Sequence, residues 1–286
     1  MAPSVFVRSP AVSARPWQAY LLIGIGLAFL TAIVLLPLVV VFWEALREGL
    51  AAYWQGIQQP EALHAIRLTL LITAVAIPLN TLFGVAIAWV LVRQSFPGQA
   101  IVLALLDLPL SISPVVAGFM LILLYSPQIG WLADLVNRWD LKIVFATPGL
   151  VLTVMFVTIP FVAREVFPVL QTLSREDEEA AQSLGATTWQ TFWRVTLPMI
   201  RPALLYGIIL STARAIGEFG AVSVVSGKII GSTNTLTLHV ERVYLEYQAT
   251  AAFACASLLA IVALLTLVLQ YWIQQQPSSA AKNRQH

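Results

Sequence analysis

Long apolar runs dominate this sequence and restrict what it can fold into. The run from Tyr20 to Trp43 contains no charged residue. As an α-helix it would extend about 36 Å, enough to cross the roughly 30 Å hydrocarbon core of a bilayer. It is also longer than the apolar part of a signal peptide, which has roughly 7–15 residues. We therefore expect it to remain in the protein as a membrane helix.

Further runs of similar length follow along the chain. They are Ile66 to Val92, Gln99 to Leu124, Pro148 to Leu170, Pro202 to Gly227 and Thr250 to Ile273. Hydrophobic residues make up 59% of the chain and charged residues 10%, against about 45–50% and 25% in soluble domains. The sequence therefore predicts an all-α integral membrane protein with six transmembrane helices within residues 20–273, flanked by tails over 1–19 and 274–286.

The basic residues indicate how such a protein is oriented, since six spans place both termini on one side. Lys and Arg on the side of the termini are Arg8, Arg15, Arg93, Arg164, Arg175, Arg194, Arg201, Lys282 and Arg284. Those on the opposite side are Arg47, Arg67, Arg138, Lys142, Lys228 and Arg242. Because Lys and Arg are enriched in cytoplasmic loops, the larger set predicts that both termini are cytoplasmic.

One long polar segment, residues 174–198, separates the fourth and fifth apolar runs. Ser174, with Asp177 three residues later, is suited to cap the start of a helix. The acidic residues 176–179 fall in the first turn, where the helix dipole favours negative charge. Gly185 is suited to end this helix, because glycine readily adopts a left-handed backbone.

A second short helix is predicted after that glycine. Thr187 and Gln190 have the spacing of a capping box, and Pro198 is expected to end the helix. Its aromatic residues Trp189, Phe192 and Trp193 share one face. The polar segment is therefore predicted to be a compact pair of helices.

The same segment resembles the EAA loop of ABC-importer permeases in both residue type and spacing. The matching residues are Glu179, Ala180, Ala181, Gly185, Leu197 and Pro198, with Val195 in place of the family's isoleucine. In that family the loop is a cytoplasmic coupling helix that sits in a cleft of the ATP-binding subunit. The resemblance implies that these residues couple this chain to an ATPase. The alternative is a connector between membrane helices that is helical for other reasons.

The stretch after this loop limits the resemblance to a smaller group of permeases. Residues 213–254 are similar to the corresponding part of sulfate/thiosulfate permeases, and the pattern R-A-x-G-E-F-G-A, which residues 214–221 match, is shared with molybdate permeases. The resemblance covers about residues 20–273. It implies a permease subunit in a bacterial inner membrane that imports sulfate and thiosulfate. Molybdate or tungstate is the alternative substrate.

The same resemblance implies a set of partners. They are a second, related permease chain, two copies of an ATP-binding subunit and an extracytoplasmic sulfate-binding protein, all assembled at the lipid bilayer. ATP and Mg would be bound by the ATP-binding subunits, so this chain would hold no cofactor. Nucleic acid is not expected as a partner, because the formal net charge is only +2.

Arg214 and Glu218 are charged residues within the fifth predicted span, where charge is costly and usually faces a cavity or a partner. They lie one helical turn apart and can pair. One interpretation is a neutralised structural ion pair. In the other, Arg214 offers positive potential along an anion path while Glu218 holds it in place.

The third predicted span contains Asp107, Ser111 and Ser113 beside Pro109 and Pro114. Prolines within a helix free backbone carbonyls that need other partners. A helix interrupted here could line a pore or gate. The alternative is a packed kink whose serine hydroxyls bond back to the backbone.

The chain carries no sequence motif for catalysis or metal binding. The stretch from Gly220 to Lys228 is two residues too long for a P-loop, and Ile229 stands where Ser or Thr is required. An enzyme with its own ATPase site is therefore not expected. The alternative class is an ion-coupled secondary transporter or channel, in which Asp107, Arg214 and Glu218 would carry ion coupling; an ATP-binding chain that copurifies would exclude it.

Overall fold

The computed structural model describes residues 16–275, and every regular element in this range is a helix. Five helices are long and apolar enough to cross a membrane, and a bent pair of shorter helices could provide a sixth crossing. The all-α membrane fold predicted from the sequence is confirmed for this part of the chain. Most of the two predicted tails lies outside the described residues.

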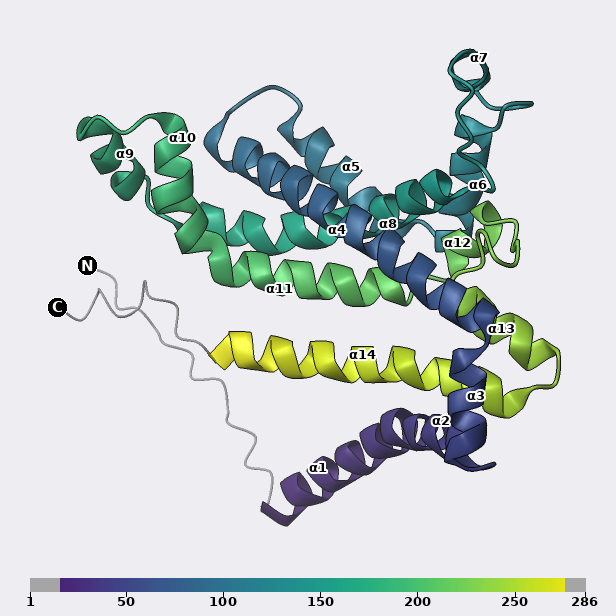
Figure 1. Cartoon of the computed structure of the whole chain (residues 1–286). Coiled ribbons are helices and arrows are strands. Elements are labelled where there is room, and N and C mark those ends of the chain that lie inside the picture. Colours follow the sequence, from purple (N-terminus) through teal and green to yellow (C-terminus); the bar gives the residue numbers. More distant parts are fainter. Residues whose placement is uncertain (1–15, 276–286) are drawn as a thin grey trace.

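The first span is one continuous helical run. It consists of α1 (Pro16–Leu30), the π-helical segment η1 (Thr31–Leu35) and α2 (Leu36–Leu46). None of the residues in its most apolar stretch is buried within this chain. In Figure 1, α2 lies against the last span, α14 (Ala249–Gln275), whereas α1 diverges from it.

Three spans that pack against one another form the centre of the molecule (Figure 1). They are α4 (Pro60–Arg93), α8 (Thr147–Thr172) and α11 (Leu197–Ile216). Glycines allow them to approach closely: a Cβ at Gly84 would lie 3.0 Å from the Cβ of Val162, and one at Gly207 would lie 3.0 Å from its Cα. Small residues at such contacts are typical of membrane helices, whose association depends on close packing.

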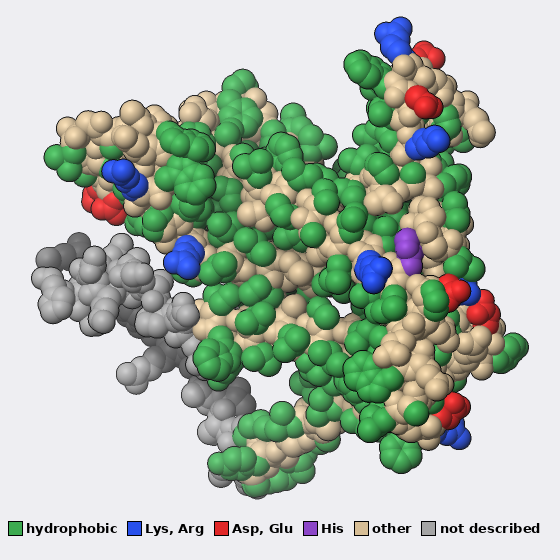
Figure 2. Space-filling view, viewed as in Figure 1, with side chains coloured by type: hydrophobic (Ala, Val, Ile, Leu, Met, Phe, Trp, Pro, Cys, Tyr) green, Lys and Arg blue, Asp and Glu red, His purple; other side chains and the backbone are tan. Residues whose placement is uncertain are grey.

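The shorter helices lie at the two ends of the spans (Figure 1). At one end are α9 (Glu176–Ser183), α10 (Thr188–Thr191) and the π-helical segment η2 (Phe192–Thr196). At the other end are α3 (Leu50–Gln58), α7 (Ala133–Arg138), α12 (Gly220–Val225) and α13 (Leu236–Leu245). Figure 2 shows hydrophobic side chains over most of the visible face, with most charged side chains toward the two ends. This distribution suits a bundle surrounded by lipid.

The third predicted span is interrupted, as the prolines within it indicated. It consists of α5 (Gln99–Ser111) and α6 (Pro114–Tyr125), which are bent by 113° relative to each other. Ile112 and Ser113 have extended ψ angles of 138° and 134°. The physical reason is Pro114, whose ring disfavours helical backbone in the residue before it.

The fifth predicted span is wrong at both ends. Its helix is continuous with α10 and η2, runs from Thr188 to Ile216, and breaks at Gly217 before the short α12 begins. Pro198 therefore does not end the second short helix as predicted. The wide π-helical turn of η2 ends at Thr196, two residues before Pro198. Such a local adjustment of the helix accommodates a proline, which cannot donate a backbone hydrogen bond.

Candidate coupling site

The helix α9 is the most exposed element between two spans, since none of its residues is buried. All four residues of its first turn, 176–179, are acidic as predicted. Ser174 acts differently from the prediction: its Oγ accepts a hydrogen bond from the amide of Glu176 at 3.0 Å, while Arg175 occupies the N-cap position. The hydroxyl thus orders the turn before the helix.

Gly185 ends α9 as the sequence predicts. Its φ angle is +90°, and the amides of Gly185 and Ala186 donate to the carbonyls of Gln182 and Ala181 at 2.9 and 3.0 Å. This pair of hydrogen bonds is the Schellman motif. The turn presents Leu184 at the tip of the element, where it is 90% exposed.

Replacement of Gly185 by valine is expected to distort this tip, because a left-handed backbone costs an L-residue about 1–2 kcal/mol and a β-branched residue more. Open space surrounds the position, so the effect comes from the backbone. If this element couples the chain to an ATPase, as the resemblance implies, the variant should reach the membrane at normal levels and retain several-fold less ATP-binding subunit on copurification. Gly185→Asn is the matched control, since asparagine tolerates this conformation; equal retention by Gly185→Val and the native chain would show that the turn does not shape the docking surface.

The capping box that starts the second helix is confirmed. The Oγ1 of Thr187 accepts from the amide of Gln190 at 3.3 Å, and Gln190 Oε1 accepts from the amide of Thr187 at 2.9 Å. This fixes where α10 leaves the loop. The aromatic residues that follow are thereby directed toward α4.

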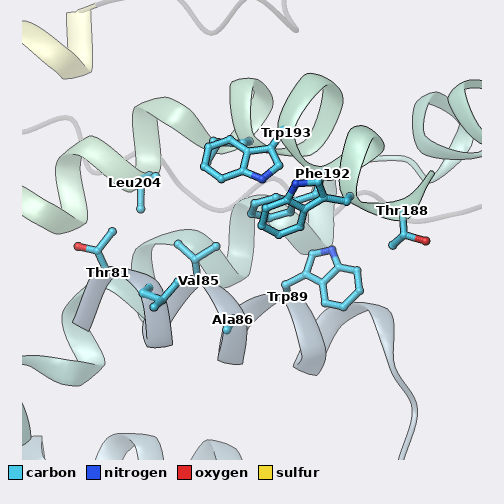
Figure 3. Close-up of a pocket in the computed structure, with 11 residues that line it drawn as sticks. Thr81, Val85, Ala86, Trp89, Thr188, Phe192, Trp193 and Leu204 are labelled. Atoms are coloured by element: carbon cyan, nitrogen blue, oxygen red, sulfur yellow. The ribbon is translucent and has the colours of Figure 1, made fainter. Parts of the chain in front are cut away.

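An apolar groove of about 460 Å³ lies between α4 and the helix that carries these aromatic residues. Figure 3 shows Trp89 and Val85 on α4, with Phe192 and Trp193 on the facing helix. The rings of Trp189 and Trp193 meet edge to face at a centroid distance of 5.5 Å. Apolar side chains of α4 and of the helix that begins at Thr188 thus face each other across this groove.

A polar contact joins α9 to the membrane bundle. Glu178 Oε1 accepts hydrogen bonds from Arg93 Nη2 and from Thr196 Oγ1, both at 2.8 Å. The side chains of Arg93 and Glu178 are only 8% and 15% exposed. Glu178 thus links α9 to the end of α4 and to η2, and we call Arg93, Glu178 and Thr196 the α9 clamp.

The sequence prediction missed Glu178 and singled out its neighbour Glu179. Glu179 is exposed, as are Ala180 and Gly185, whereas Ala181 is half-buried. These residues form an outer surface on which a partner could dock. Leu197 and Pro198, predicted with them, instead lie on α11, where Leu197 lines the apolar groove.

The predicted pairing of Arg214 and Glu218 is confirmed. Arg214 Nη1 lies 2.7 Å from Glu218 Oε2, and the two side chains are 34% and 1% exposed. Glu218 Oε1 also accepts a hydrogen bond from the amide of Ala221 at 2.9 Å, and its carbonyl accepts one from Thr237 Oγ1 at 2.9 Å. Glu218 therefore holds together the break between α11 and α12.

The two broken helices meet inside the bundle. A Cβ at Gly220 would lie 2.9 Å from the Cβ of Pro114, and one at Gly118 would lie 2.7 Å from the carbonyl oxygen of Ala221. The break between α5 and α6, with its exposed Ser111 and Ser113, is therefore next to the break that Glu218 stabilises. Interrupted backbone at membrane depth is tolerated where it is buried in protein or lines a cavity.

Asp107 has a different partner. Its Oδ1 lies 3.5 Å from Nε of Arg164 on α8, and both side chains are about half exposed (50% and 56%). Ser111 Oγ donates to the carbonyl of Asp107 at 3.4 Å, as the kink interpretation predicts. The carboxylate of Asp107 is thus compensated by a positive charge.

Comparison with known proteins places these features in a family context. Residues 80–278 match the family model described as "Binding-protein-dependent transport system inner membrane component". The chain is 51% identical over 257 residues to the sulfate transport system permease protein CysW of Synechocystis sp., covering 90% of this chain and 93% of the relative. It is 39% identical over 245 residues to the sulfate transport system permease protein CysT of Escherichia coli K12, covering 86% and 88%.

The fold is also similar to that of a chain in a crystal structure of a bacterial alginate ABC transporter in complex with an alginate pentasaccharide-bound periplasmic protein. The TM-score is 0.72, and the match covers 92% of this chain and 95% of that chain. The sequence identity is 18%, so this similarity concerns the fold alone.

Proposed function

The chain belongs to the family of binding-protein-dependent transport system inner membrane components, and on that premise we propose that it is the permease subunit of an ABC importer for sulfate and thiosulfate. The observation that carries the substrate assignment is the similarity to a CysW sulfate permease along nine-tenths of the chain. Similarity to CysT is lower, which favours a CysW-like role beside a second, CysT-like permease chain.

The physical problem is the transfer of a doubly charged, strongly hydrated anion across hydrocarbon, which is prohibitive without a protein path. The sequence of this chain has no P-loop, so energy is drawn from ATP and Mg bound to two partner subunits. The exposed surface of α9, with Glu179, Ala180 and Leu184, docks on those subunits. The α9 clamp and the aromatic groove then transmit their movement to α4 and α11.

The proposed path follows the meeting point of the two broken helices. Arg214 supplies positive potential there, and Glu218 holds the guanidinium in place. Ser111 and Ser113 offer hydroxyl groups to the anion. Asp107 is compensated by Arg164 at 3.5 Å, which reduces its repulsion of a dianion.

The proposed orientation places α9, α10 and both termini in the cytoplasm. The extracytoplasmic sulfate-binding protein then delivers its ligand at the opposite end, where α7, α12 and α13 lie (Figure 1). Lipid and the second permease chain surround the spans. No nucleic acid takes part in this function.

A topology experiment tests the orientation. An accessible cysteine at Gly185 is expected to be labelled only from the cytoplasm, and one at Trp139 in the loop that contains α7 only from outside. Trp139 is 68% exposed, so labelling there depends on the side and not on burial. The reverse pattern would contradict the proposed orientation.

The substrate is tested by uptake in cells that lack the native gene and express this chain with its partner subunits. We expect uptake of labelled sulfate that excess thiosulfate inhibits. Uptake of molybdate without uptake of sulfate would contradict the substrate assignment while leaving the family assignment intact. Cells that carry the empty vector provide the control.

A further inference from the structure

A second cavity lies near the coupling end of the molecule, at the last turns of α4 and α8. Its volume is about 520 Å³, within the roughly 300–1,000 Å³ range of small-molecule sites. It is lined by Leu91, Val92, Arg93, Gln99, Gln171, Leu173 and Arg175. Its polar lining side chains are two guanidinium groups and two carboxamides, with no carboxylate among them.

Arg93 places a largely buried guanidinium group at this cavity. Its Nη2 is bound to Glu178, but its Nε is buried and has no hydrogen-bond partner among the described residues. The side chain is 92% buried, as its exposed fraction is 8%. The atom Nε is closed to a ligand in the cavity, because it has almost no exposed surface; what the cavity meets is the rest of the Arg93 guanidinium, which lines it.

Arg175 stands at the same cavity. Its Nη2 donates to the carbonyls of Val92 and Arg93 at 3.3 and 3.5 Å. None of the ion pairs found among residues 16–275 includes Arg175. Arg93, Arg175 and Glu178 together therefore leave one net positive charge, and Arg175 retains donors that can turn toward a ligand.

Gln99 and Gln171 complete the donor set. Gln99 Nε2 donates to the carbonyl of Leu91, which holds this side chain at the cavity. Paired guanidinium groups recognise the oxygens of phosphate and related anions through several parallel hydrogen bonds. We propose that this cavity binds a tetrahedral oxyanion group, either free sulfate or phosphate or the phosphate of a lipid headgroup, between Arg93 and Arg175.

Binding there would act on the coupling element. The oxyanion would join the guanidinium of Arg93, whose Nη2 remains on Glu178, to Arg175, the N-cap residue of α9. Occupancy would therefore hold the start of α9 against the end of α4. This inference concerns a site apart from the transport path and does not depend on which anion is transported.

Hydrogen exchange of the purified full-length chain in phosphatidylcholine nanodiscs tests the proposal. Sulfate and phosphate are added separately, with chloride at equal ionic strength as the reference. If the ligand is a free anion, exchange in residues 174–183 slows with sulfate or phosphate and not with chloride. If the ligand is the phosphate of a lipid headgroup with net negative charge, exchange slows only in nanodiscs that contain phosphatidylglycerol, because choline neutralises the phosphate of phosphatidylcholine.

Two variants make the result specific. Arg175→Gln should lower the affinity for whichever anion or lipid slows exchange by at least about tenfold. This is the loss expected for one hydrogen bond to a charged group. Arg194→Gln is the control, because Arg194 is an exposed arginine on η2 that does not line the cavity. Equal protection by chloride, equal behaviour of the two variants, or no protection by any of the anions and lipids would overturn the proposal.

Discussion

Replacement of Glu218 by glutamine is expected to destabilise the folded chain by about 3 kcal/mol. Loss of one member of a buried ion pair typically costs roughly 3–5 kcal/mol, and the lower figure applies because Arg214 is 34% exposed. The variant leaves the guanidinium of Arg214 without its carboxylate inside the bundle. Thermal unfolding in detergent and the amount of protein in the membrane measure the effect.

The double variant, with both Arg214 and Glu218 changed to glutamine, should recover much of this loss, because no uncompensated charge remains. Glu241→Gln is the matched control. It breaks the pair of Glu241 with Lys228, whose side chains are 32% and 49% exposed, and an exposed pair contributes only about 0–1 kcal/mol. Equal stability of the single and double variants would contradict the structural role of the intramembrane pair.

Replacement of Glu178 by glutamine is expected to separate ATP hydrolysis from transport. The change removes the negative charge that holds Arg93 and weakens both hydrogen bonds of the α9 clamp, and hydrogen bonds to charged groups contribute about 1.5–3 kcal/mol each. Helix α9 should then move without α4 and η2. In the assembled transporter we expect at least a tenfold decrease in substrate moved per ATP hydrolysed, with ATP hydrolysis itself retained.

The control for this experiment lies on the same helix. Glu176 is an exposed acidic residue in the same turn, so Glu176→Gln changes the net charge equally without touching the clamp. Thr196→Val removes only the hydrogen bond from the uncharged donor and leaves the ion pair of Arg93 with Glu178 in place. It should therefore reduce the ratio of transport to ATP hydrolysis less than Glu178→Gln does. If Glu178→Gln and Glu176→Gln behave alike, the clamp does not transmit movement.

Features determined by local chemistry were predictable from the sequence. The end of α9 at Gly185 and the capping box of Thr187 and Gln190 depend on a few neighbouring residues, and both were predicted correctly. The first, second, fourth and last spans were predictable because apolar runs of this length are stable only in a membrane or in a protein core. The pairing of Arg214 with Glu218 was predictable because helical geometry places residues four apart on one face.

Features that depend on tertiary packing were not predictable in this way. Arg93 and Glu178 are 85 residues apart, and no local pattern distinguishes Glu178 from Glu179. The prolines near Ser113 indicated an interruption, but the bend of 113° requires the partner α12 against which α6 packs. Pro198 is a helix breaker by its local chemistry, yet the π-helical turn of η2 carries the helix through it.

Reconstitution tests the central claim most directly. The chain is incorporated into proteoliposomes with the second permease chain, the ATP-binding subunits and the sulfate-binding protein, and uptake of labelled sulfate is measured with and without ATP. Our account predicts uptake that requires ATP and every one of these subunits, and none with this chain alone. Sulfate uptake driven by an ion gradient in the absence of ATP would contradict it.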